Sequence, residues 1–218
     1  MFPLNTVLYP GVTLPLHVFE DRYRALVQHL LAIADPAERL FGTVAIREGY
    51  EVGPHGTQSL YRVGVRMQLN EVESNPDGSY EIVATGRDRF VLGALETTGE
   101  FASGAITESP DEADEGTSVL HDRARTTFTA YQAAVSGLQG ARFTGVPDHL
   151  PRDPGFLSWT LAALAPLPMA ERQALLEADS PRARLELVTQ LLRDELRAIN
   201  VIPSLPATDV ARTAWSPN

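Results

Sequence analysis

The sequence predicts an α+β protein in which a β-rich half is followed by a helical half. Apolar and polar residues alternate within the extended segment 60–72, as in a strand with one buried face. Apolar residues recur at steps of three and four over 120–138, as on one side of a helix. The acidic segment 108–117 lies between these patterns and is interrupted by Pro110 and Gly116, so it is predicted to be a loop or linker.

Residues 1–24 predict two short strands and the beginning of a helix. The apolar segments 7–9 and 12–18 are separated by Pro10-Gly11, which favours a tight turn. Alternation along 12–18 would place one set of side chains on one face, Leu14, Leu16 and Val18, and another set on the opposite face, Thr13, Pro15 and His17. A helix is predicted over 20–34, where four apolar residues share one side, Tyr23, Leu26, Leu30 and Ile33.

Further strands are predicted at 41–47, 60–72, 80–85 and 90–95, with a turn-rich loop at 53–57. The run Asn75-Pro76-Asp77-Gly78 is a strong turn signal, because proline presets φ and glycine accepts a positive φ. An open sheet of so many short strands would expose its edges, so we expect closure into a small barrel.

Four helices are predicted in the second half, at 120–138, at 154–165, at 169–178 and from Ser180-Pro181 onward. Pro154 and Pro181 suit the first helical turn, where a missing N–H costs nothing, and Ser180 suits the N-cap. These elements define three predicted regions: a β-rich subdomain at 1–107, a helical subdomain at 118–202 and a loose tail at 203–218.

The composition excludes several kinds of chemistry. The 218-residue chain has no cysteine, so disulfides, thiol nucleophiles and cysteine-ligated metals are excluded. All 18 basic residues are arginines, so no Schiff-base lysine, phosphate-loop lysine or Ser–Lys dyad can form. The five histidines have no metal-ligand spacing, and no Gly-x-Gly-x-x-Gly occurs. We therefore expect neither a cofactor nor a metal.

Charge and hydropathy limit the partners and the location. The net charge is −10, and the arginines form pairs, such as Arg87 with Arg89, rather than a stripe, which argues against nucleic acid. No apolar run is long enough to cross a bilayer, and the N-terminus lacks a signal-peptide pattern. The sequence therefore predicts a cytoplasmic protein that binds neither nucleic acid nor membrane.

Several segments resemble the N-terminal domain of the Lon protease family. The opening run from Phe2 to Arg24 is similar to the start of that domain in its order of strands, prolines and helix. Gly56-Thr57 resembles its Gly-Thr strand start, and the segment 86–90, Gly-Arg-Asp-Arg-Phe, resembles its hairpin ending in Gly-x-x-Arg-Phe. The segments 161–168, 173–177 and 184–187 are similar to its helical half. The likeness extends from Phe2 to Ile202.

This resemblance implies a PUA-like, β-rich pseudo-barrel followed by an α-helical bundle. In full-length Lon an ATPase and a Ser–Lys protease domain follow, whereas this sequence has no phosphate loop and no lysine. It is therefore expected to be similar to the stand-alone Lon-domain proteins of bacteria, and the same domain serves protein–protein contact in cereblon. The resemblance implies non-enzymatic recognition of unfolded or degron-bearing polypeptides by an adaptor or chaperone-like binder, with an ATP-dependent protease as a partner.

Six residues in the most family-like segments are candidate substrate contacts: Leu14, Pro15, His17, Phe19, Tyr23 and Arg89. An exposed apolar remainder of the strand at 12–18 would suit an extended polypeptide, either in a groove or by strand addition. Turn formation, core packing and ion pairing also explain these residue types, and for each single residue the structural explanation is favoured.

A small-ligand-binding protein or an enzyme that uses the cleft between the two subdomains is the alternative function. A deep pocket with convergent polar groups would favour it, whereas a long shallow apolar groove would favour polypeptide binding. A triad of Ser158, His149 and Asp148 is disfavoured because no Gly-x-Ser-x-Gly elbow is present, so no catalytic residue is expected.

Overall fold

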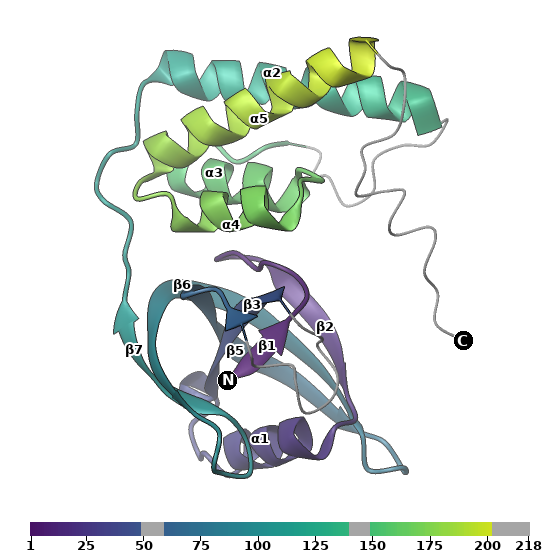
Figure 1. Ribbon diagram of the computed structural model, residues 1–218, viewed down its shortest axis with the longest axis vertical. Coiled ribbons are helices and arrows are strands. Elements are labelled where there is room, and N and C mark those ends of the chain that lie inside the picture. Colours follow the sequence, from purple (N-terminus) through teal and green to yellow (C-terminus); the bar gives the residue numbers. More distant parts are fainter. Residues whose placement is uncertain (49–58, 140–148, 202–218) are drawn as a thin grey trace. The chain divides into compact units, whose positions relative to one another are not determined.

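A computed structural model describes residues 1–48, 59–139 and 149–201 and divides the chain into two compact units, Met1–Pro110 and Asp111–Asn218. We call them unit 1 and unit 2. Strands and one α-helix form unit 1, and four α-helices form unit 2, so the predicted α+β class is confirmed (Figure 1). The loop expected at 53–57 and the tail expected at 203–218 lie outside the described residues.

Unit 1 is built on a curled, mixed sheet. Its strands are β1 (Phe2–Leu4), β2 (Thr13–Val18), β3 (Leu40–Glu48), β4 (Ser59–Leu60), β5 (Val63–Ser74), β6 (Tyr80–Glu96) and β7 (Ser103–Glu108). The order is β1-β3-β5-β6-β2, with β4 beside β3 and β7 beside β6. Only the β1–β3 pairing is parallel among the described strands. Since β1 and β2 end this path without pairing to each other, the sheet is a half-barrel rather than the expected closed barrel.

The opening segment differs from the prediction in its first strand. Phe2–Leu4 forms β1 because it pairs with residues 43–45 of β3, whereas 7–9 is buried but joins no strand. The chain then turns at Gly11, whose φ is +80°, and crosses closely over Gly86 of β6. A Cβ at Gly86 would collide with the carbonyl oxygen of Tyr9, so this crossing requires glycine.

The two strands predicted at 80–85 and 90–95 are one strand, β6, of 17 residues. The prediction left residues 86–89 between two strands, but β5 pairs with β6 across this segment, with register shifts at Arg66/Met67 and Leu69/Glu71. β7 was not predicted, because only Ile106 is a large apolar residue among its six and no apolar–polar alternation marks it as a strand. Pairing with β6 fixes it as a strand.

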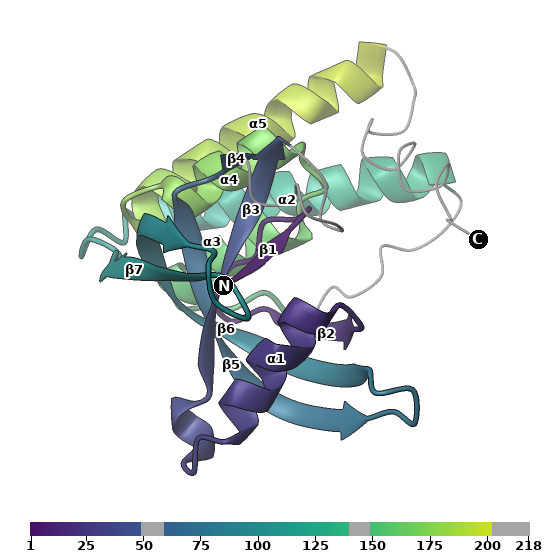
Figure 2. The ribbon, with the colours of Figure 1, turned by 60° about the horizontal axis from the view of Figure 1, so that its bottom comes forward.

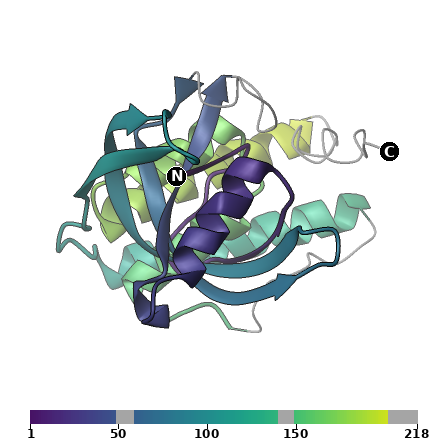
Figure 3. The ribbon, with the colours of Figure 1, turned by 90° about the horizontal axis from the view of Figure 1, so that it is seen from below.

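Helix α1 (Asp21–Leu31) covers one end of the curled sheet (Figure 3). Its buried side chains are Tyr23, Leu26, Val27 and Leu30, as the periodicity predicted for three of them. The ring of Tyr23 stacks on that of Phe2 with centroids 4.1 Å apart. The 3-10 helix η1 (Pro36–Glu38) follows, and the Asp35 carboxylate caps it by accepting from the Ala37 N–H.

Unit 2 contains α2 (Ser118–Gln139), α3 (Pro154–Leu164), α4 (Met169–Glu177) and α5 (Pro181–Val201), close to the four predicted helices. Helix α5 packs against the other three (Figure 1). Phe128 and Tyr131, from the apolar stripe predicted for α2, are buried, and so are Leu185 and Leu192 of α5. No helix in the described ranges is both long and apolar enough to span a bilayer.

A fully buried arginine, Arg184 of α5, organises the centre of unit 2. Its guanidinium donates to both carboxylate oxygens of Asp111, at 2.5 and 3.2 Å, and to the Ser158 hydroxyl at 2.7 Å. It also lies over the ring of Trp159, 3.0 Å from the centroid. Two main-chain carbonyls accept from it as well, those of Leu175 and Ala178.

The acidic segment 108–117, predicted to be a loop or linker, is anchored along its length. Asp111 is held by Arg184, the Glu112 N–H donates to the Asp179 carbonyl at 2.8 Å, and the Asp114 carbonyl accepts from the Arg182 N–H at 2.9 Å. The segment from Asp111 onward therefore belongs structurally to unit 2.

The N-cap of α5 is expected to contribute measurably to the stability of the protein. The Ser180 hydroxyl is buried and accepts from the Ala183 N–H at 3.2 Å, as the Ser-Pro sequence predicted. We expect Ser180→Ala to lower the free energy of unfolding by about 1 kcal/mol, because a helix N–H loses its partner. Urea denaturation measures this loss, and Ser180→Asn, which can also cap, should recover most of it. Equal stability of the wild type and Ser180→Ala would contradict this role.

Candidate functional site

Strand β2 forms one edge of the sheet. Its only partner strand in the described part of the chain is β6, and the two pair without a bulge from Thr13–Thr85 to Val18–Tyr80. Figure 2 shows β2 beside the β5–β6 hairpin, which projects past α1. The outer side of β2 is thus not covered by another described strand.

The main-chain hydrogen bonds of β2 alternate between its two sides. The Gly86 N–H donates to the Val12 carbonyl at 2.9 Å, which defines a hydrogen-bonded pair just before the strand. Because such pairs alternate in an antiparallel ladder, three residues direct their main-chain groups toward β6, namely Leu14, Leu16 and Val18. Three others direct theirs outward, namely Thr13, Pro15 and His17. Pro15 has no N–H, so it occupies an outward position, where proline is tolerated at an edge.

The side chains of β2 follow the predicted alternation. Thr13, Pro15 and His17 are exposed, whereas Leu14 and Leu16 are half-buried and Val18 is buried on the other face. His17 is hydrogen-bonded through Nδ1 to Oε1 of Glu81 at 2.5 Å, and its ring stacks with that of Phe19 at 5.8 Å. The Phe19 side chain is 54% exposed, which is unusual for a large apolar residue.

Carboxylates line the same exposed face on the neighbouring strands. Glu81 of β6 pairs with Glu73 of β5, and both side chains are exposed. Glu71 of β5 pairs with Val83 and shares this face by alternation. We call Glu71, Glu73 and Glu81 the acidic row. It faces solvent next to the outward-pointing edge of β2.

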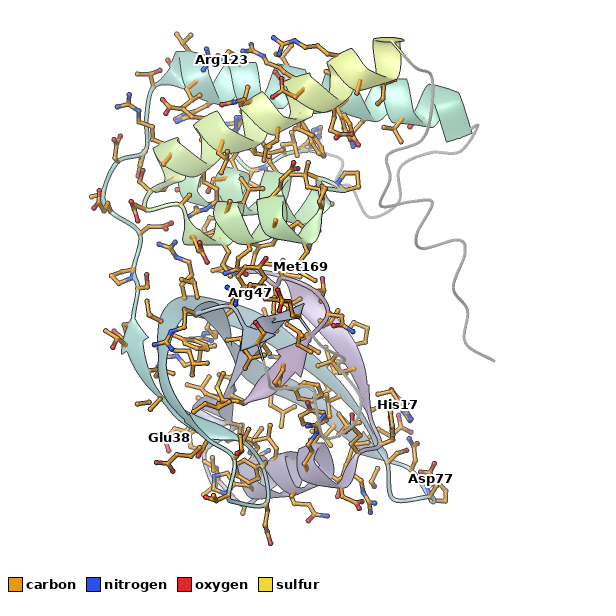
Figure 4. All side chains as sticks on the ribbon, in the orientation of Figure 1. His17, Glu38, Arg47, Asp77, Arg123 and Met169 are labelled. Atoms are coloured by element: carbon orange, nitrogen blue, oxygen red, sulfur yellow. The ribbon has the colours of Figure 1, made fainter. Side chains whose placement is uncertain are left out.

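The tip of the β5–β6 hairpin adds a further negative charge near His17. Figure 4 shows His17 and Asp77 on the same side of unit 1, with Glu38 on the other side. The Ser79 N–H and hydroxyl both donate to the Asp77 carboxylate, and together with His17 they lower the pKa of Asp77. Asp77 is therefore held in its charged form over a wider pH range than a free aspartate.

The structure brings only part of the predicted site together. Pro15, His17 and Phe19 lie along one exposed edge. Leu14 points to the opposite face of β2, and Tyr23 is buried against Phe2. Arg89 is also buried, and it donates to the Pro110 carbonyl at 3.4 Å. The exposed edge thus contains three of the six candidates.

Ser158, the serine of the disfavoured catalytic triad, has a structural role instead. Ser158 is fully buried, donates to the Gly155 carbonyl at 2.7 Å and accepts from Arg184. His149 is exposed, and Asp148 lies outside the described residues. Within the three described ranges, no group of three or more His, Asp or Glu side chains is arranged to hold a metal ion.

Each unit also has a cavity. In unit 1 a cavity of about 230 Å³ lies between α1 and the β7 region, lined mainly by apolar residues that include Leu30, Phe41 and Phe101. The N-terminal amine of Met1, which also lines this cavity, donates to the Ala102 carbonyl at 2.6 Å, and burial lowers its pKa to about 6. In unit 2 a more polar cavity of about 470 Å³ is formed by α2 and α5, with Arg123 and Arg193 among its lining residues.

The sequence reasoning missed the acidic row and the outward main-chain groups. The row could have been found from the turn at 75–78, because that turn places Glu73 opposite Glu81 and alternation places Glu71 on the same face. The exposure of the outer side of β2 had no local signal except Pro15, since it depends on which strands pair in the folded sheet.

A curled mixed sheet with one covering helix, joined to a four-helix unit, defines the structural class of this protein. Within that class, the chain belongs to the family of the ATP-dependent protease La (LON) substrate-binding domain, whose family model matches residues 1–194. The resemblance seen in the opening residues is thereby confirmed.

Relatives and solved structures agree with this assignment. The chain is 27% identical over 199 residues to the Lon protease of Escherichia coli K12 and 28% identical over 222 residues to that of Anaeromyxobacter dehalogenans. These matches cover 90% and 96% of this chain but only 24% and 25% of those proteins. The chain thus spans about a quarter of the length of these relatives.

Two solved structures share the fold. The Lon N-terminal domain protein from Xanthomonas campestris superposes with a TM-score of 0.62 at 26% identity, covering 88% of this chain and 95% of that one. The N-terminal domain of the Mycobacterium avium complex Lon protease gives 0.59 at 20% identity, covering 88% and 97%.

Proposed function

We propose that this protein is a non-enzymatic recognition module for unfolded or degron-bearing polypeptide segments, acting as an adaptor or chaperone-like binder. The observation that carries the proposal is the exposed edge formed by Pro15, His17 and Phe19, in a chain of the LON substrate-binding family. An extended, apolar client segment could bury Phe19 and contact the exposed face of β2.

Other observations support binding rather than chemistry. Ser158, the serine of the disfavoured triad, is fully buried and hydrogen-bonded to Gly155 and Arg184. The proposed partner is an ATP-dependent protease that would receive the bound polypeptide, by analogy with the Lon proteases it resembles. The proposed location is the cytoplasm, in agreement with a sequence that has no cysteine.

Binding of a permanently unfolded client tests this function directly. We expect a fluorescent disulfide protein, reduced and blocked with the neutral carbamidomethyl group so that it stays unfolded, to bind in the low micromolar range, as followed by anisotropy, and its native form to bind at least about tenfold more weakly. The physical reason is that only the unfolded form presents extended main chain and exposed apolar side chains. Equal binding of the two forms, or no binding of either, would rule out the proposed function.

A pair of matched variants locates the contact. Phe19→Ser removes the exposed ring beside β2, and Phe156→Ser removes another ring, 66% exposed, from α3 in unit 2. We expect Phe19→Ser to weaken binding of the unfolded client about five- to tenfold, because exposed aromatic anchors often dominate an interface, and Phe156→Ser to change it less than about twofold. The reverse ranking would show that the client does not bind at β2.

A further inference from the structure

We propose that β2 binds its client by strand addition, and that the preferred client strand carries basic side chains at alternate positions. This inference rests on the proposed function and names the binding mode and the chemical class of the ligand. It follows from two independent features of unit 1: the outward main-chain groups of β2 and the charge of the face beside them.

The main chain of β2 is suited to receive another strand. Thr13 and His17 each direct an N–H and a carbonyl outward, and Pro15 directs a carbonyl, so five main-chain groups are available along the edge. None of these groups has a partner among the described residues. The strand of six residues spans about 20 Å without a bulge, which is long enough to hold an extended segment of similar length.

Edges of this kind are usually blocked by charge, bulges or a covering segment. On β2 only Pro15 hinders the addition of another strand, and it does so incompletely. Pro15 removes one donor, but the strand is regular, and its outward-pointing residues Thr13 and His17 retain theirs. A single proline at the middle outward position lowers the affinity for an added strand without preventing the addition.

The acidic row favours an added strand that carries basic side chains. An added strand would lie about 5 Å from β2 and about 10 Å from β6, so a long cationic side chain on its exposed face could extend across β2 to Glu81. Glu73 stands directly opposite Glu81, an arrangement of like charges that costs stability in an isolated sheet. A cation placed beside the pair would relieve this repulsion. His17 is the only basic side chain of β2 itself.

A second copy of this chain fits the edge less well. Pairing β2 with β2 of another molecule would bring two acidic rows together on chains that each carry a net charge of −10. Since like charges across an interface oppose association, the charge of the site favours a basic client over self-association.

The first experiment uses the wild-type protein and short synthetic peptides. One peptide alternates arginine and valine, and a control peptide alternates glutamate and valine at the same length. We expect the arginine peptide to bind at least about tenfold more tightly at low salt, with the difference shrinking as salt is added. Equal affinities would overturn the charge selection, and sedimentation of the protein alone as a dimer would indicate that a second copy occupies the edge.

Amide exchange distinguishes strand addition from contact with side chains. By residue-resolved NMR, saturation with the arginine peptide should slow exchange of the Thr13 and His17 amides about tenfold or more, because these outward N–H groups acquire acceptors. The Leu14 and Leu16 amides already face β6 and should change little. Peptide binding that leaves Thr13 and His17 unprotected would overturn the strand-addition mode, whatever its affinity.

Substitutions at one position separate main chain from side chain. His17→Pro removes the outward N–H and the imidazole while leaving the β6 ladder intact, and His17→Ala removes only the imidazole. We expect His17→Pro to bind the arginine peptide about five- to tenfold more weakly than His17→Ala. Matching affinities of the two folded variants would contradict the main-chain contact, and Thr13→Pro against Thr13→Ala repeats the comparison at the other outward N–H.

The acidic row has a matched charge control in the same unit. Glu73→Gln and Glu38→Gln make the same change in net charge, and Glu38 lies on the opposite side of unit 1 from His17 (Figure 4). We expect only Glu73→Gln to reduce the preference for the arginine peptide, by about threefold. If unfolded clients bind but these peptides and variants show no such pattern, the proposed function stands and this inference fails.

Discussion

Replacing Arg184 with alanine is expected to lower the free energy of unfolding of unit 2 by about 3–5 kcal/mol, since it removes a buried guanidinium together with its ion pair, hydrogen bonds and packing. The guanidinium is fully buried and makes a bidentate pair with Asp111. Its removal also takes away the hydrogen bonds that Arg184 donates to the Ser158 hydroxyl and to two main-chain carbonyls, and it opens a cavity beside Trp159. Several costs therefore fall on one substitution.

The measurement is urea denaturation followed by circular dichroism, with Arg182→Ala as the matched control. Arg182 is two residues away on the same helix, but its side chain is 53% exposed and its ion pairs are on the surface, so its loss should cost far less than the loss of Arg184. The variant Asp111→Asn, alone and combined with Arg184→Ala, completes a double-mutant cycle. Similar costs for Arg184→Ala and Arg182→Ala would show that the buried cluster does not stabilise unit 2.

Gly64→Ala is expected to destabilise unit 1 by about 3 kcal/mol or more, because no space exists for a methyl group there. A Cβ at Gly64 would collide with the Thr43 carbonyl oxygen and would lie 2.6 Å from Val44 Cγ1 and 2.8 Å from Phe90 Cζ. Val44 and Phe90 are core residues, and Thr43 is fixed in β3, so these neighbours can move only by disturbing the sheet.

Gly137→Ala is the matched control, because the same substitution is expected to raise the stability there rather than lower it. Gly137 lies within α2, and nothing stands within 4 Å of its added Cβ. Because alanine has a higher helix propensity, this variant should be more stable by about 0.5–1 kcal/mol. Thermal unfolding of both variants beside the wild type tests the pair. A Gly64→Ala protein as stable as the wild type would mean that the sheet tolerates a wider spacing there.

The helical half could be predicted because its signals are local. The apolar stripes of α2 and α5 and the Ser-Pro start of α5 depend on residues a few positions apart, and the structure places them as expected. The partner of Arg184 could not be predicted in this way, because Asp111 is 73 positions away in sequence. Nothing in the sequence distinguishes Arg182 from Arg184, yet the Arg182 side chain is exposed and that of Arg184 is fully buried.

The sheet was less predictable because its strands depend on distant partners. The two strands expected at 80–85 and 90–95 are separated in sequence by a glycine and three charged residues, but pairing with β5 keeps β6 continuous. For the candidate site, alternation gave the two faces of β2 correctly. The burial of Tyr23 and Arg89 and the openness of the outer side of β2 depend on the folded arrangement of unit 1, which no local pattern encodes.

The anchoring of the acidic segment decides where this protein can be divided into separately expressed halves. The Ser109 N–H donates to the Arg89 carbonyl, and the Pro110 carbonyl accepts from the Arg89 side chain, whereas Asp111 pairs with Arg184. A gene fragment beginning at the first residue of α2 would encode a bundle that lacks Asp111, the carboxylate that pairs with its buried cation. A fragment beginning at Asp111 keeps that pair. The position of the cut is therefore set by one carboxylate rather than by the ends of the helices.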